Sequence, residues 1–171
     1  STSLQANNSE MKHAVTALLF ICISFFGFSQ AITDSTLISL LTGSPGTELY
    51  STFGHSAIRV QVPAQNMDIV FNYGTFDFNT PNFYLKFVRG QLKYKLAVEE
   101  YKNFKTSFEY ENRSVVEQKL NLTNAQKAKM VALLFQNYEP ENRFYKYDFF
   151  FDNCAKKIRD IMISGLSAAR S

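Results

Sequence analysis

The sequence predicts an α+β fold, in which a small antiparallel sheet packs against helices. Short stretches of alternating apolar and polar residues, typical of strands, are interspersed with stretches of helical periodicity. Two of the alternating stretches follow each other closely enough to form a hairpin. Apolar residues make up 46% of the 171-residue chain, which is enough to bury the core of one domain of ordinary size.

The first strand of the predicted hairpin covers residues 55–62 and the second covers residues 69–73. Pro63 and Gly74 end them. In an antiparallel pair the start of one strand faces the end of the other. We therefore expect His55 to lie near Asn72 or Tyr73.

The other elements follow from the same patterns. Residues 82–88 and 99–108 are predicted helices, and residues 91–98 and 113–122 are predicted strands. Thr123 caps a helix that runs to about residue 138, and Gln126 completes a capping box. A last helix begins near Cys154 and places its apolar residues on one face. The members of that face are Cys154, Ile158, Ile161 and Gly165.

The N-terminal part predicts export. Residues 11–30 have the basic start, the apolar run and the small-residue processing site of a secretory signal. The apolar run is shorter than the roughly 20 residues that span a bilayer, so an uncleaved anchor is the less favoured alternative. Residues 1–10 precede Met11 and look like a non-native or upstream extension. Residues 31–171 then form a single domain.

Charge and cysteine content narrow the function. The formal net charge of +3 is spread out, without the basic run that nucleic-acid binding needs. Removal of the signal would take Cys22 with it, leaving Cys154 as one free thiol with no disulfide partner. A free thiol in an exported domain requires a reason. Catalysis is the first candidate and intermolecular pairing is the second.

Cys154 and His55 have the chemistry of a thiol nucleophile and its base. The start of a helix carries free N–H groups and partial positive charge, so we expect the pKa of the Cys154 thiol to be lowered. We also expect its sulfur to lie within about 4 Å of a His55 ring nitrogen. The structural alternative is that Cys154 is core packing and His55 is an ordinary residue.

A catalytic histidine needs a partner that orients its ring. The hairpin register favours Asn72, then Tyr73, with Asp77 as a third choice. An orienting partner for His55 would complete a nucleophile, base and orienter set.

Two further roles concern the start of the last helix. The backbone N–H of Cys154 and a side-chain donor such as Tyr50 are candidates for an oxyanion hole. Asp152 and Asn153 have the residue types of a helix N-cap. One cysteine and one histidine are too few soft ligands for a zinc site, so we expect neither a metal nor another cofactor.

Four segments carry a resemblance to a known family: SPGTELYSTFGHSAIRV (residues 44–60), VFNYGTFDF (70–78), NFYLKFVRG (82–90) and YDFFFDNCA (147–155). Together they resemble the N-terminal periplasmic domain of the Lnb-type bacterial lipoprotein N-acyltransferases. That resemblance implies a circularly permuted papain-like (NlpC/P60-like) fold. It also implies that Cys154 is the nucleophile and His55 the base, in the order His55, Asn72, Cys154.

The resemblance implies an envelope acyltransferase that moves an acyl chain from a phospholipid, through a Cys154 thioester, to the N-terminal cysteine of a lipoprotein. It further implies a periplasmic, membrane-associated location and a C-terminal membrane part beyond Ser171. Two alternatives stay open. One is a cysteine amidase or peptidase acting on cell-wall peptides, and the other is a non-enzymatic envelope module.

Overall fold

The computed structural model describes residues 32, 34–77, 79–146 and 153–167. The predicted signal at residues 11–30, the residues before it and the predicted cap residue Asp152 lie outside these ranges.

The described residues form a six-stranded sheet and four α-helices, which confirms the predicted α+β class. The strand order is β5-β1-β2-β3-β4-β6, and every neighbouring pair is antiparallel. The strands are β1 (Leu37–Gly43), β2 (His55–Val62), β3 (Met67–Thr75), β4 (Lys93–Glu100), β5 (Val115–Lys119) and β6 (Phe144–Lys146). The helices are α2 (Phe83–Val88), α3 (Tyr101–Tyr110), α4 (Asn124–Tyr138) and α5 (Cys154–Leu166), with short 3-10 turns η1 (Leu49–Ser51) and η2 (Pro63–Gln65).

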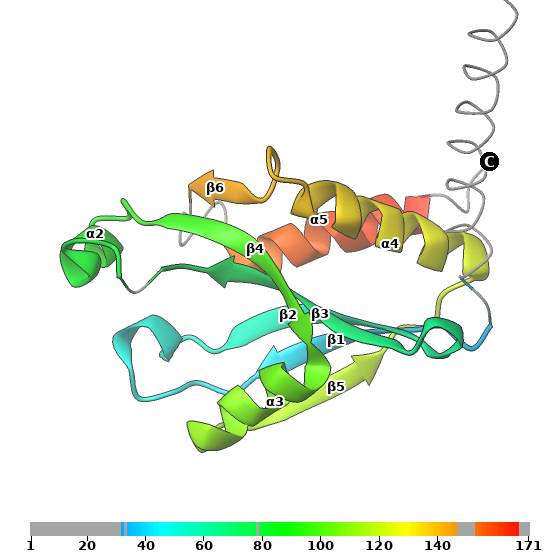
Figure 1. Cartoon of the computed structure of the whole chain (residues 1–171), viewed down its shortest axis with the longest axis horizontal. Helices are drawn as coiled ribbons and strands as arrows, with labels where there is room; N and C mark the ends of the chain where they lie inside the picture. The colour runs from blue at the N-terminus through cyan, green and yellow to red at the C-terminus, as the bar shows by residue number, and fades with distance from the viewer. Residues whose placement is uncertain (1–31, 33, 78, 147–152, 168–171) are drawn as a thin grey trace, which may run out of the picture.

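Helices cover both faces of the sheet (Figure 1). On one face α4 and α5 pack over a core that includes Ile58, Val60 and Phe71. On the other face α3 packs Phe104 and Phe108 over a smaller cluster. Side chains alternate along a strand, so neighbouring residues of β2 and β3 face opposite layers. This alternation decides which side of the sheet each candidate site residue faces.

The helix ends agree well with the sequence. Thr123 and Gln126 form the predicted capping box at the start of α4. The predicted apolar face of α5 is buried at Ile158, Ile161 and Gly165. A Cβ at Gly165 would overlap the side chain of Met130, so glycine permits the close approach of α5 to α4.

Strand pairing explains where the observed bounds differ from the predicted ones. The predicted helix 99–108 begins at Tyr101, because Glu99 and Glu100 pair with β3 and extend β4. The predicted strand 113–122 is only Val115–Lys119, because β5 pairs only with residues 39–43 of β1. Tertiary pairing outweighs local propensity at both places.

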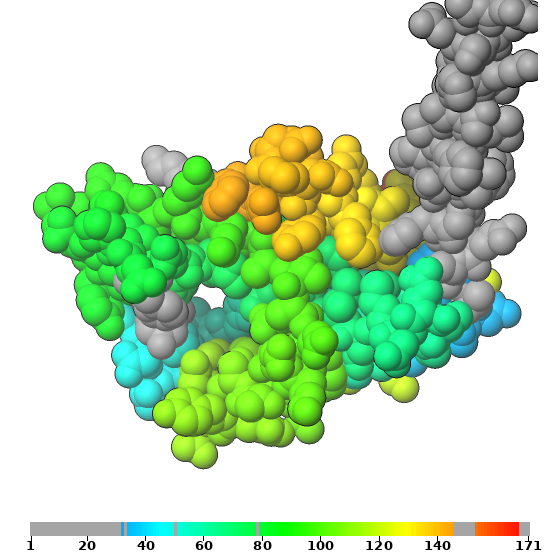
Figure 2. Space-filling model, in the orientation of Figure 1, coloured from blue at the N-terminus to red at the C-terminus, as the bar shows by residue number. Residues whose placement is uncertain are grey.

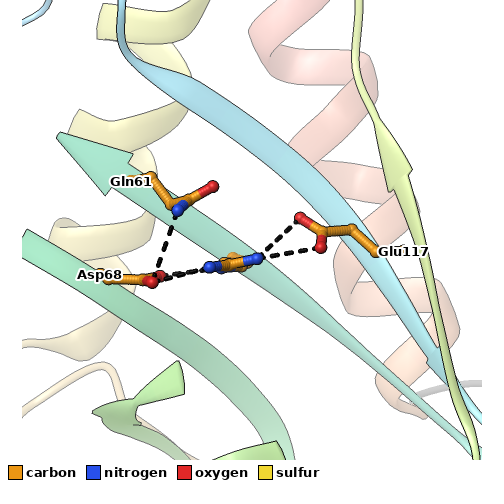
Figure 3. Close-up of polar contacts among 4 residues, drawn as sticks. Gln61, Asp68 and Glu117 are labelled. Carbon is orange, nitrogen blue, oxygen red and sulfur yellow. Dashed lines mark hydrogen bonds and ion pairs between the residues drawn. The ribbon is translucent and has the colours of Figure 1, made fainter. Parts of the chain in front are cut away.

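A charged cluster ties β2 to its surroundings on the α3 face. The Arg59 guanidinium donates to Asp68 at 2.7 and 2.8 Å and to Glu117 at 2.9 and 3.1 Å. Figure 3 shows Asp68 and Glu117 on opposite sides of this group. The guanidinium also lies 3.4 Å from the centroid of the Tyr101 ring of α3. One side chain thus connects three strands and a helix.

Replacing Arg59 by methionine is expected to lower the free energy of unfolding by about 2–3 kcal/mol. The Arg59 side chain is only 11% exposed, and its loss leaves Asp68 and Glu117 without their shared cation. Urea denaturation measures the change. The control is Lys105→Met, because Lys105 pairs with Glu109 at a site where both side chains are more than half exposed, and we expect less than about 0.5 kcal/mol there. Equal effects at the two positions would contradict the prediction.

Candidate functional site

The site forms at the end of the sheet where β2 begins and β3 ends. The pairing of β2 with β3 runs from Val62↔Met67 to Ile58↔Phe71 and stops there. Beyond that point β3 has a register shift against β4 between Asn72 and Thr75. Gly74 adopts a φ of +88° within this irregular stretch, a conformation that favours glycine. The end of β3 therefore departs from regular pairing with both of its neighbours, β2 and β4.

The structure brings His55 and Asn72 together, as the hairpin register predicts. His55 Nε2 lies 2.6 Å from Asn72 Oδ1. Ala57 and Val70, each two residues away along its strand, pack in the cluster under α3. His55 and Asn72 thus lie on the α3 face of the sheet.

Glu99 fixes the orientation of the Asn72 amide. Asn72 Nδ2 donates to Glu99 Oε1 at 3.0 Å, so Oδ1 is the atom presented to His55. A carbonyl oxygen can only accept, so His55 Nε2 carries the hydrogen. In the neutral imidazole this leaves Nδ1 as the acceptor, which is the nitrogen able to take a proton.

The sequence patterns do not indicate Glu99 as a site residue, because they predict that it begins a helix. The signal lies in the pairing of β3 with β4. Asn72 pairs with Ala97, and Glu99, two residues further along β4, faces the same side of the sheet. The sequence patterns do not predict the pairing of β3 with β4, so they do not predict the contact between Asn72 and Glu99 either.

Cys154 is the first residue of α5. Asn153 caps the helix, with its Oδ1 accepting from the Lys156 N–H at 2.9 Å, which confirms the cap predicted there. The Cys154 side chain is half-buried and packs against the core between the sheet and the α4–α5 layer. The thiol thus approaches the site from the side opposite to α3.

Burial raises the pKa of the Cys154 thiol. The backbone N–H groups of Ser56, Ala155 and Cys154 lower it by hydrogen bonding toward the sulfur, but removal from water outweighs them. The lowered pKa expected from the helix start alone is therefore wrong for this structure. The position of the Ser56 N–H, directly after His55, was not foreseen from the sequence.

Cys154 and His55 converge at Gly74. A Cβ placed on Gly74 would lie 3.7 Å from Cys154 Cβ and 3.9 Å from His55 Cε1. The hydroxyl of Tyr145 lies 3.9 Å from the same point. The absence of a side chain at Gly74 leaves space between the thiol and the imidazole.

Cys154 and His55 both lie in the described part of the chain, and no hydrogen bond joins the Cys154 sulfur to the His55 ring. The approach to about 4 Å stays a prediction. Catalytic hydrogen bonds are often long in a free enzyme and tighten when substrate binds.

The pKa of His55 is lowered, chiefly because the ring is buried. The nearby Arg113 cation also lowers it, whereas the hydrogen bond to Asn72 raises it. A lowered pKa keeps the imidazole neutral at pH 7. The site thus holds a neutral imidazole and a protonated thiol.

His55 lines two cavities, each of about 290 Å³. One is lined by Phe53 and the β1–β2 turn. The other lies between Asn72, Phe76 and Arg113. Figure 2 shows the surface hollowed between the green of α2 and β4 and the yellow-green of α3. His55 is therefore accessible to a ligand of limited size.

Arg113 is a second residue of the site that the sequence patterns do not indicate. Its side chain is only 9% exposed and pairs with Glu111 at 2.8 Å. Its Nε donates to the Ser44 carbonyl at 2.9 Å, and its guanidinium lies 4.3 Å from the Phe108 ring centroid. These contacts fix a cation in the wall of the cavity beside His55.

The other candidates have different surroundings. The Tyr73 hydroxyl accepts from Asn137 at 3.0 Å on the α4–α5 side, and burial raises the pKa of Tyr73. The exposed Asp77 carboxylate accepts from the Asn79 N–H at 2.9 Å. Neither is the partner of His55, so Asn72 is the orienting residue that the geometry supports. Tyr50 lies in η1, and its side chain, like Asp152, falls outside what the structure describes.

Within the described ranges no group of three or more His, Cys, Asp or Glu side chains could hold a metal ion.

Residues 28–169 match the protein family described as the Lnb N-terminal periplasmic domain. The chain belongs to this family. No curated protein and no solved structure matches the chain. Membership in the Lnb N-terminal domain family supports a periplasmic, cell-envelope location and is compatible with an enzyme. In the described part of the chain, no helix has the length and apolar character to cross a membrane.

Proposed function

We propose that this Lnb-family domain is a cysteine-dependent acyltransferase, with Cys154 as nucleophile, His55 as base and Asn72 as the residue that orients the base. The observation that carries the proposal is the 2.6 Å contact between His55 Nε2 and Asn72 Oδ1, next to a thiol at the start of α5. The order His55, Asn72, Cys154 supports a permuted papain-like arrangement.

The first half-reaction forms a thioester. His55 Nδ1 takes the thiol proton as the Cys154 sulfur attacks the ester carbonyl carbon of a phospholipid. The N–H groups of Cys154 and Ser56, which hydrogen-bond toward the sulfur in the free enzyme, donate to the negative oxygen that develops. When the tetrahedral intermediate collapses, the carbon–oxygen bond breaks. The leaving alkoxide takes the proton from the imidazolium.

The second half-reaction transfers the acyl group. An amine, which we assign to the N-terminal cysteine of a lipoprotein, attacks the thioester carbonyl carbon. His55 takes a proton from the attacking nitrogen, the carbon–sulfur bond breaks, and the proton returns to sulfur. The product is an amide, and the thiol and the neutral imidazole are restored.

A hydrolase of cell-wall peptides is the second candidate. The cavity beside His55 contains the charged pair of Arg113 and Glu111 as well as aromatic rings. Charged walls suit a peptide better than an acyl chain, whereas Phe76 and Phe108 suit the chain. Such an enzyme would use the same thiol and base, with water resolving the acyl-enzyme.

The test is to trap the acyl-enzyme. Incubation of the protein with phospholipid and no amine acceptor is expected to raise the intact mass by one fatty acyl chain. Neutral hydroxylamine is expected to remove that chain, because a thioester is cleaved where an oxygen ester survives. His55→Ala is expected to prevent the adduct.

Cys22 provides an internal control wherever the full chain is used, because the Cys154→Ala variant retains that thiol. An adduct on Cys154→Ala would overturn the assignment of the nucleophile. No adduct from phospholipid, together with cleavage of a muropeptide, would establish the hydrolase instead. If the protein carries out neither reaction, the non-enzymatic module is the reading that stands.

A further inference from the structure

Exposed apolar side chains gather at the end of the molecule that holds the site. On α2, Tyr84, Leu85 and Val88 are 59%, 50% and 72% exposed. In and after η1, Leu49 and Phe53 are 49% and 73% exposed. Both segments lie at the left in Figure 1, and α2 lies on one side of the hollow of Figure 2. Clustered exposed apolar residues mark interaction surfaces.

The inward face of α2 is fixed to the site. Phe76 lines the cavity beside His55, and its ring centroid lies 5.2 Å from that of Phe83 and 6.5 Å from that of Phe87. The inner side chains of α2 therefore pack on the wall of the cavity. Its outward side chains are exposed.

The sequence around α2 is strongly positive. Between Asp77 and Glu99 there is no acidic residue, and there are four basic ones: Lys86, Arg89, Lys93 and Lys95. Among the described residues, none of the four takes part in an ion pair. Exposed apolar residues beside unpaired cations are typical of a segment that lies in the interface of an anionic bilayer.

We propose that the α2 face, defined as Tyr84, Leu85 and Val88 with Lys86 and Arg89, docks on the surface of a bilayer that contains anionic phospholipid. This inference rests on the proposed phospholipid donor, which docking would bring to the end of the molecule that holds the cavity. A second copy of the chain is a poorer occupant, since a two-fold contact would bring the same cations against each other.

The chain contains no tryptophan, so a single introduced indole reports on one position. Tyr84→Trp is compared with Ile163→Trp on α5, because both native side chains are 59% exposed and α5 ends at the opposite end of the molecule (Figure 1). Both changes are made in Cys154→Ala, so that no chemistry takes place. The probes are vesicles of phosphatidylethanolamine with phosphatidylglycerol, and vesicles of phosphatidylcholine alone.

With the anionic vesicles we expect Tyr84→Trp emission to shift to the blue and to be quenched by brominated lipid, with no change for Ile163→Trp. Adding Leu85→Ser and Val88→Ser, or Lys86→Glu and Arg89→Glu, is expected to weaken lipid binding at this position about tenfold. A position-specific signal is needed because the apolar run before residue 30 would bind lipid by itself.

Three outcomes would overturn the proposal. They are an unchanged Tyr84→Trp spectrum, an equal shift of Ile163→Trp, and a shift that grows with protein concentration in the absence of lipid. The result is independent of the acyl-transfer test. A thioester on Cys154 without docking refutes only this inference, and docking without a thioester refutes only the proposed function.

Discussion

Replacing Cys154 by alanine is expected to abolish acyl transfer, and replacing His55 by alanine to slow it by about 10⁴-fold. Without the sulfur there is no atom to carry the acyl group. Without the imidazole, the thiol keeps its proton at neutral pH, because burial raises the pKa of Cys154. Transfer of a fluorescent acyl chain from phospholipid to a lipopeptide measures both effects.

The double variant distinguishes a catalytic pair from two structural residues. If the two residues act as one unit, the double variant is no slower than Cys154→Ala. Cys154→Ser is the matched variant for packing, since it retains nearly the same shape in the core. Circular dichroism and urea denaturation establish that each variant folds. Normal transfer by folded Cys154→Ala would refute the proposed mechanism.

Local sequence patterns predicted the elements and one side of the site. Strand alternation over residues 55–62 and 69–73 was enough to place His55 near Asn72 or Tyr73, with Asn72 favoured, since an antiparallel hairpin leaves little freedom of register. Capping chemistry likewise located the starts of α4 and α5. These predictions depend on contacts between residues that are close in the sequence.

The parts that the sequence did not predict depend on long-range contacts. Glu99 reaches Asn72 only because β4 pairs with β3, and Arg113 reaches the cavity through the turn after α3. The pKa of Cys154 depends on burial between the sheet and α5, which the helix start alone does not reveal. Three-dimensional packing decided each of these features.

Replacing Asn72 by alanine is expected to slow acyl transfer by about a hundredfold. The variant removes the acceptor of the His55 Nε2–H, so the ring loses both its orientation and the bond that fixes its tautomer. That bond raises the pKa of His55, and its loss lowers this pKa further. The acid limb of the pH–rate profile, which reports protonation of the free base, is therefore expected to move to lower pH.

Variants of Glu99 distinguish a residue that positions Asn72 and His55 from one that is merely structural. In Glu99→Ala the Asn72 amide is free to rotate and to present Nδ2 to His55. Because Nδ2 is itself a donor, the His55 Nε2–H then has no acceptor on Asn72. We expect about a tenfold loss of rate and a partial change of tautomer, read from two-bond ¹H–¹⁵N spectra of labelled histidine. His13→Gln assigns the His55 signals. Glu99→Gln retains an acceptor for Asn72 Nδ2 and is expected to restore most of the rate.

Glu100 is the matched control, because it is an exposed carboxylate at the next position of β4 and Ile69, not Asn72, is its strand partner. Glu100→Ala is expected to leave the rate, the pH profile and the tautomer of His55 unchanged. If Glu99→Ala has the same spectrum and the same pH profile as Glu100→Ala, Glu99 does not set the tautomer. Asn72 would then hold the imidazole by a single hydrogen bond, and the orientation of its amide would have to come from the substrate.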